Sequence, residues 1–327
     1  MNFRWMDLIG NVFRGVLMGG ADVIPGVSGG TVALIVGIYE RLVTAISRID
    51  SISFGHLRKR EFAQLFERVD LVLLAPLGIG IAIGIVALGG LMNSLLLAPA
   101  TRSFTLAAFF GMILASAVLV ASIVQSRNTK ERITHFLLGL VGVGVALSIS
   151  LISPNHADEL SYGYIFVCGL LAICAMILPG ISGAYILLLL GAYEHLTDIL
   201  KRLPKGDVDM GDLITIAVFG CGCVIGLLSF SRLLQRLLRD HKSVTMSVLV
   251  GFMIGALRKI WPFQQDLTPE IEKLKHKQYE LYFPEFNSEL LFVILIAIGA
   301  AATVWALVWF TQKVSDDKPA DKPEVKS

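Results

Sequence analysis

The chain has 327 residues, of which 55% are hydrophobic and only 17% are charged, and its mean hydropathy is +0.71. This composition excludes an ordinary soluble domain, because the apolar residues come in long runs separated by short charged stretches. The net charge is +2 and no basic block is interleaved with aromatic residues, so no nucleic-acid partner is expected. The expected partner is the lipid bilayer, and the expected fold class is an all-α polytopic membrane protein.

Six apolar runs are long enough to cross the bilayer as helices, which takes roughly 18 residues. In chain order they are Leu71–Leu97, Phe104–Val124, Ile133–Ile152, Leu213–Phe230, Val244–Ile260 and Leu290–Phe310. The segment Pro262–Glu289 mixes charged and aromatic residues and is expected to be an extramembrane loop with some helix. The charged tail at 313–327 is expected to be disordered and cytoplasmic.

Two further apolar stretches, 8–39 and 162–193, are each interrupted near the middle. The interruptions are Pro25-Gly26-Val27-Ser28-Gly29-Gly30 and Pro179-Gly180-Ile181-Ser182-Gly183. Proline lacks an N–H and disfavours helix in the residue before it, while glycine allows a sharp turn. Each stretch is therefore predicted to be two half-helices joined by a non-helical elbow. Irregular backbone at membrane depth needs protein or a watery cavity around it, so the elbows are expected to face a site inside the protein.

The two elbow regions align without a gap at an offset of 154 residues. The likeness continues downstream, since Gly80 and Gly84 match Gly222 and Gly226. The chain is therefore predicted to be a duplicated half, with repeats at 1–152 and 153–312, each containing one interrupted stretch and three crossing helices.

The orientation of the repeats depends on whether the interrupted stretches cross the membrane. As re-entrant hairpins they leave three crossings in each half, and the halves are inverted, as in many secondary transporters. If the interrupted stretches instead cross the membrane fully, each half has four crossings and the repeats are parallel. Positive charge in the loops favours the hairpins only slightly. The shortness of the half-helices is the main reason to expect hairpins and inverted repeats.

The start of a half-helix inside a membrane attracts an anion through unsatisfied N–H groups and the positive end of its dipole. The elbows add glycines, which let a ligand approach the backbone, and hydroxyls, which hydrogen-bond to it. The candidate anion-binding residues are Pro25, Gly26, Ser28, Gly29, Gly30, Thr31, Pro179, Gly180, Ser182, Gly183 and Tyr185. The alternative is that the serines only cap helices and the glycines only allow close packing.

Four ionisable residues near the elbows are candidates for coupling or counter-charge. Arg14 either provides the counter-charge for a bound anion or extends its guanidinium to the cytoplasmic surface. Asp22, which aligns with Met176, either binds a coupling H⁺ or Na⁺ or pairs with Arg14. Glu40 and Glu194 end the half-helices that follow the elbows. Each either has a gating or coupling role or only forms a solvated helix end at the membrane interface. No metal site and no cofactor other than the coupling ion is expected.

From Gly19 to Thr31, and again from Gly37 to Glu40, the chain resembles a family of bacterial membrane proteins called domain of unknown function 368. That family includes polyprenyl-phosphate translocases. The resemblance implies a flippase of the bacterial cytoplasmic membrane that returns undecaprenyl phosphate from the outer to the inner leaflet for cell-envelope glycan synthesis. It implies that the bound anion is the lipid phosphate, and ion coupling is expected.

Two other functions stay open from the residues alone. Undecaprenyl pyrophosphate phosphatases have a Pro-Gly-x-Ser-Arg-Ser motif that the first elbow partly matches, but Gly29 and Gly183 stand where the arginine is needed. An enzyme is therefore not expected. Chloride channels also aim serine-bearing helix ends at an anion, so a small-anion channel or exchanger is the second alternative. The coupling ion, net direction, exact lipid and oligomeric state are not specified by the sequence.

Overall fold

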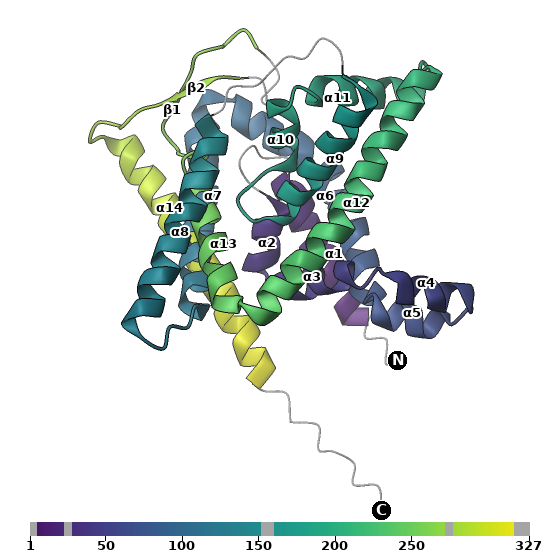
Figure 1. The fold of residues 1–327 in the computed structure, drawn as a ribbon. Coiled ribbons are helices and arrows are strands. Elements are labelled where there is room, and N and C mark those ends of the chain that lie inside the picture. The colour runs from purple at the N-terminus through teal and green to yellow at the C-terminus, as the bar shows by residue number, and fades with distance from the viewer. Residues whose placement is uncertain (1–4, 23–27, 152–159, 272–276, 317–327) are drawn as a thin grey trace, which may run out of the picture.

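The structure is a computed structural model that describes residues 5–22, 28–151, 160–271 and 277–316 (Figure 1). The described chain is helical apart from one short ribbon of two strands. The long helices are α6 (Leu71–Leu97), α7 (Pro99–Ile123), α8 (Thr129–Leu151), α12 (Met210–Asp240) and α14 (Ser288–Asp316). The shorter ones are α1 (Trp5–Asp22), α2 (Gly29–Ile35), α3 (Tyr39–Ser47), α4 (Ser51–Arg58), α5 (Phe62–Arg68), α9 (Tyr162–Ile177), α10 (Gly183–Leu189), α11 (Tyr193–Arg202) and α13 (Lys242–Ala256), with a 3₁₀ turn at Leu203–Lys205.

Five helices of the described chain, α6, α7, α8, α12 and α14, are long and apolar enough to cross a membrane. The protein is therefore an all-helical, multi-pass membrane protein. Helix α6 covers the same residues as the first crossing expected from the sequence. Helix α12 continues ten residues beyond Phe230, where Arg232 donates from Nη2 to the carbonyl of Ile49 at 2.7 Å. Helix α14 continues into the first residues of the expected tail, as far as Asp316.

The fifth expected crossing, Val244–Ile260, is shorter than the sequence predicts. Helix α13 has 15 residues and ends at Ala256, so it spans only about 22 Å of a hydrocarbon core of about 30 Å. Residues Leu257–Ile260 form tight turns instead, with the amide of Lys259 donating to the carbonyl of Ala256 at 2.9 Å. The helix therefore ends four residues before the predicted crossing does, and two of those four residues, Arg258 and Lys259, are charged.

The segment after α13 contains a β-ribbon where the sequence predicts some helix. Strands β1 (Gln264–Asp266) and β2 (Tyr279–Leu281) pair antiparallel. Arg102, near the start of α7, donates to Gln264 Oε1 at 2.7 Å and to the hydroxyl of Tyr279 at 2.7 Å. The ribbon is thus fixed by a side chain from the other half of the sequence, which local sequence signals do not reveal.

Helices in the two halves pack through glycines that align in the sequence. A Cβ on Gly80 of α6 would clash with the carbonyl of Val12 in α1, and a Cβ on Gly222 of α12 would clash with the carbonyl of Phe166 in α9. Val12 and Phe166 themselves are 154 residues apart, the offset of the elbows. The same small-residue contact therefore joins the first helix of each half, α1 or α9, to the first long helix after its elbow, α6 or α12.

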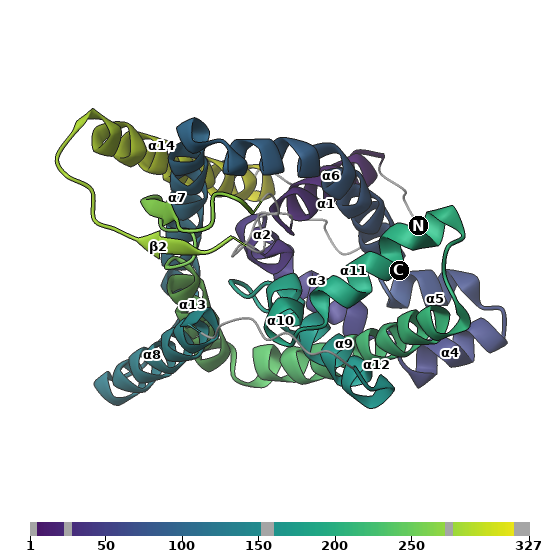
Figure 2. The same ribbon diagram turned by 90° about the horizontal axis from the view of Figure 1, so that it is seen from above.

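The middle helices of the two halves make a second pair of matching contacts, this time between halves. Gly111 of α7 meets the carbonyl of Ala297 in α14, and Gly251 of α13 meets the carbonyl of Gly139 in α8. In Figure 2 the pairs α7–α14 and α8–α13 lie on one side of the molecule, while α2 and α10 lie in its interior. The short half-helices are thus enclosed by the long ones.

The connections gather at two opposite ends of the molecule. At one end lie α3 to α5 (Figure 1), the loop after α7 and the start of α13, where the amide of Gln125 donates to Ser243 Oγ at 3.1 Å. At the other end lie α11, the start of α7, the β-ribbon and the start of α14, where Ser103 Oγ bonds to Glu289 at 3.1 Å. We call these the α4–α5 end and the ribbon end.

Candidate functional site

Two seven-residue helices, α2 and α10, follow the interruptions in the sequence. Ser28 caps α2, its hydroxyl accepting from the amide of Gly30 at 3.1 Å. Ser182 caps α10, accepting from the amide of Tyr185 at a longer 3.4 Å. Each helix is followed, two residues after its end, by a glycine of positive φ, +72° at Gly37 and +71° at Gly191. Their boundaries therefore follow from the same cap residues in both halves.

The two elbows are in direct contact. The hydroxyl of Thr31 accepts a hydrogen bond from the amide of Gly180 at 2.9 Å. Ser28 Oγ lies 3.3 Å from the carbonyl oxygens of Met176 and Leu178, which accept from it. The hydroxyl of Tyr39 donates to the carbonyl of Ile177 at 3.1 Å. Side chains of the first elbow thus satisfy backbone groups exposed where the second helix is interrupted.

The candidate glycines are closely surrounded in this conformation. A Cβ on Gly30 would lie 2.7 Å from the carbonyl of Ile177, and one on Gly183 would lie 2.5 Å from the carbonyl of Ala172. Gly180 has φ +83°, which only glycine adopts without strain. Pro179 is buried beside it, whereas Pro25 and Gly26 lie outside the described residues. In this conformation these glycines allow neighbouring backbone segments to pack closely.

Asp22 supplies a negative charge to the start of α2. Its Oδ1 accepts from the amide of Gly29 at 2.6 Å, and the positive end of the helix dipole favours a carboxylate at this position. A Cβ on Gly29 would lie 2.9 Å from the other carboxylate oxygen, so only glycine allows this approach. The start of α2, where the sequence predicts an anion, is therefore already occupied by a carboxylate from the chain itself.

Lys259, which the sequence analysis does not single out, supplies a positive charge beside the second elbow. It lines a small cavity together with Ser182, Tyr185 and Gly180. Its ammonium lies over the ring of Tyr185. Its buried Nζ makes no hydrogen bond within the part of the chain that the structure describes. In the sequence Lys259 stands at the end of the predicted crossing Val244–Ile260, where a lysine ordinarily marks the membrane surface.

The two elbows consequently differ in charge although their backbones match. Asp22 aligns with Met176, and Lys259 aligns with Leu119 under the offset that relates Gly111 to Gly251. The first elbow therefore has a carboxylate that the second lacks, and the second has an ammonium that the first lacks. An anion is attracted to the second elbow and a cation or proton to the first.

The other candidate charges lie away from the elbows. Arg14 donates to Asn11 Oδ1 at 2.8 Å and does not pair with Asp22, because eight residues of one helix separate them by about 12 Å. Glu40 forms an ion pair with Lys242 at 2.7 Å, and its side chain is half-exposed. Glu194 is exposed at the start of α11. Thus only Asp22 of the four lies against an elbow.

The arrangement suits the binding of an anion and does not provide a metal centre in the described chain. No group of three or more His, Cys, Asp and Glu side chains comes together among the described residues. The groups that do converge are a buried ammonium, a hydroxyl and the start of a short helix. These are donors to an anion such as phosphate.

Comparison with known proteins gives a consistent result across most of the chain. Residues 18–279 match the family model described as undecaprenyl phosphate translocase-like. A polyprenyl-phosphate transporter of Vibrio cholerae serotype O1 is 34% identical over 95% of this chain and 99% of its own length. Another, from Staphylococcus aureus, is 30% identical over 80% of this chain and 87% of its own length. No solved structure matches the chain significantly.

Proposed function

The chain belongs to the undecaprenyl phosphate translocase-like family, and we propose that it moves a polyprenyl phosphate between the leaflets of the bacterial cytoplasmic membrane. The observation that carries the proposal is the buried ammonium of Lys259 beside Ser182 at the second elbow. A phosphate monoester carries about 1.5 to 2 negative charges at neutral pH. Such a headgroup needs a counter-charge and hydrogen-bond donors wherever it leaves water.

We assign the headgroup to the second elbow, at Ser182, Gly183 and Lys259, rather than equally to both elbows. Asp22 would repel a phosphate from the start of α2, while Lys259 attracts one to the start of α10. The cavity beside Lys259 is small in this conformation, so phosphate binding requires the elbows to separate. The bond from Gly180 to Thr31 is then one of the contacts that must break.

The proposal includes two inverted repeats with re-entrant hairpins. Helix α2 leads directly into α3 near the α4–α5 end, and α10 leads directly into α11 at the ribbon end (Figure 1). This supports a first hairpin that returns to the α4–α5 end and a second that returns to the opposite one. Matching glycine contacts, such as Gly80 with Val12 and Gly222 with Phe166, support the same symmetry. Inverted halves are suited to exposing one site alternately to each leaflet.

The α4–α5 end is the cytoplasmic end in this proposal. It carries the basic loops of the sequence, including Arg58, Lys59, Arg60, Arg127, Lys130 and Arg132, and positive loops stay in the cytoplasm. An anion that moves inward across an inside-negative membrane is opposed by about 2.3 kcal/mol per charge per 100 mV. A coupling H⁺ or Na⁺ offsets this cost, and we assign its binding to Asp22, whose side chain lies against the first elbow.

Translocation of undecaprenyl phosphate in proteoliposomes tests the proposal. The fraction of lipid accessible to an external phosphate-binding probe is followed over time, with phosphate release recorded in parallel and protein-free vesicles as the control. We expect accessibility to fall with the protein present and no phosphate to be released. No change under several ion gradients would contradict transport. Release of phosphate would assign the protein to lipid-phosphate hydrolysis instead.

A further inference from the structure

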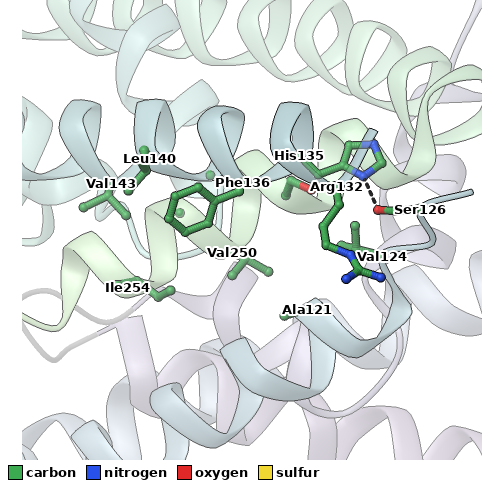
Figure 3. A pocket seen from close by; sticks show the side chains of 13 residues that line it. Ala121, Val124, Ser126, Arg132, His135, Phe136, Leu140, Val143, Val250 and Ile254 are labelled. Atoms are coloured by element: carbon green, nitrogen blue, oxygen red, sulfur yellow. Dashed lines mark hydrogen bonds between the residues drawn. The ribbon is translucent and has the colours of Figure 1, made fainter. Parts of the chain in front are cut away.

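A groove separate from the elbows lies between α7, α8 and α13 (Figure 3). Its volume is about 570 Å³, within the range of about 300 to 1,000 Å³ that is common for small-molecule sites. Its walls come from both halves of the sequence, because α7 and α8 precede the second elbow and α13 follows it. Ser126, in the loop that follows α7, lines the groove, so one end of the groove lies at the α4–α5 end.

One end of the groove is polar. Figure 3 shows Arg132, His135 and Ser126 together there. Arg132 and His135 are three residues apart on α8 and so share one face of the helix. His135 Nδ1 lies 2.9 Å from Ser126 Oγ. The guanidinium of Arg132 is exposed and makes no hydrogen bond or ion pair with any residue that the structure describes.

Apart from Ser247, the remaining residues that line the groove are apolar. Leu140, Val143, Val250 and Ile254 line it away from the polar end (Figure 3). Phe136 is 66% exposed and Leu140 is 49% exposed, so this part of the groove is open on the side of α8. In a membrane that side faces lipid. A molecule in the groove has its charged end at Arg132 and its apolar end along α8 and α13.

We propose that this groove binds an isoprenyl phosphate in the cytoplasmic leaflet, with the phosphate at Arg132 and His135 and the first isoprene units along the apolar wall. This inference rests on the proposed function, and it adds a second site for the same class of lipid at the α4–α5 end. The lipid would occupy it on entering or leaving the protein.

Charge complementarity favours a terminal phosphate over an ordinary phospholipid. A planar guanidinium binds a phosphate through two parallel hydrogen bonds, and it does so best when the phosphate has free terminal oxygens. An isoprenyl phosphate has such a terminal group on a single chain. A phospholipid has a phosphodiester with substituents on both sides and two chains. The groove has one cationic end and one apolar channel, which matches the single chain.

Photolabelling with a diazirine-bearing farnesyl phosphate tests the inference. The full-length protein is placed in nanodiscs of neutral lipid, and the labelled residues are mapped by mass spectrometry. We expect label on α8 and α13 along the groove, competed by undecaprenyl phosphate and not by an equal excess of phosphatidylglycerol. Arg132→Gln should lower the labelling of the groove about tenfold, because a charged hydrogen bond is lost.

Arg127→Gln is the matched control, since Arg127 is exposed in the loop just before α8 and does not line the groove. It should leave the labelling unchanged.

Val143→Trp provides a second test, because it fills the apolar part of the groove while both cationic side chains stay. Like Arg132→Gln, it should lower the labelling. Equal labelling in wild type and Arg132→Gln, or equal competition by phosphatidylglycerol, would overturn the inference. Transport of undecaprenyl phosphate by the same preparation would then leave the proposed function standing, whereas its absence in the wild type would contradict the proposed function itself.

Discussion

The hydroxyl of Thr31 accepts a hydrogen bond from the backbone amide of Gly180 at 2.9 Å, which joins residues 149 positions apart in the sequence. Thr31 is completely buried, so this bond is formed away from water. Gly180 has no helical partner for its amide, because α9 has ended at Ile177 and α10 has not yet begun. The first elbow therefore completes the hydrogen bonding of the second.

Thr31→Val should destabilise the protein by about 1 to 3 kcal/mol, the cost of leaving a buried donor without an acceptor. Valine has nearly the shape of threonine, so little packing is lost. The thermal unfolding midpoint of the detergent-solubilised protein measures the effect. Thr134→Val is the control, because Thr134 is exposed and bonds only to the carbonyl of Lys130 one turn earlier. Equal midpoints for the two variants would mean that the contact between elbows contributes nothing.

The two capping serines should behave differently when replaced by alanine. Ser28→Ala removes a buried cap and two bonds to the second elbow, so stability should fall by about 0.5 to 2 kcal/mol. Ser182→Ala removes a weak cap of 3.4 Å beside Lys259, so stability should change less while transport of undecaprenyl phosphate slows. If the double variant transports at the wild-type rate after correct insertion, neither serine binds phosphate.

Hydropathy and helix-breaking residues were sufficient to predict the long helices and the two interruptions. Helix α6 occupies Leu71–Leu97, because Asp70 precedes its apolar run and Pro99 follows. The interruption before Ser182 follows from Pro179 and Gly180. These features are local, and local patterns determine where a helix begins and ends.

The contacts between distant segments were not predictable from one sequence. Three features depend on tertiary structure. They are the hydrogen bond between Thr31 and Gly180, the hydrogen bond from Arg102 to the β-ribbon, and the end of α13 at Ala256. Lys259 lies at the end of a predicted crossing, where a lysine ordinarily marks the membrane surface. Only the fold brings it beside Ser182 and so makes it part of the candidate site.

Lys259→Met should lower transport of the lipid phosphate without lowering the stability of the protein. Removing the ammonium should lower transport of undecaprenyl phosphate at least about tenfold, since a charged hydrogen bond to the headgroup is lost. Stability should stay equal or rise, because an apolar side chain of similar volume removes the cost of burying a charge. Proteoliposome transport and the thermal midpoint give the two measurements on the same preparation.

Lys205→Met is the control for loss of a positive charge, because Lys205 is exposed after α11. It should change neither transport nor stability. A Lys259→Met protein that transports normally would remove Lys259 from the headgroup site. One that transports poorly because it is unfolded would show a lowered thermal midpoint, which is the opposite of the expected result.

Asp22→Asn should abolish the dependence of transport on a coupling ion while keeping the fold. The asparagine carbonyl still accepts from the amide of Gly29, the bond that Asp22 makes at 2.6 Å, but it has no charge to bind a proton or sodium. Transport is measured at several pH values and with sodium replaced by potassium. Asp7→Asn is the control, because Asp7 is exposed in the first turn of α1 and should leave the dependence intact. A pH or sodium dependence that survives in Asp22→Asn places the coupling site elsewhere, and Glu40, which is paired with Lys242, then becomes the next carboxylate to replace.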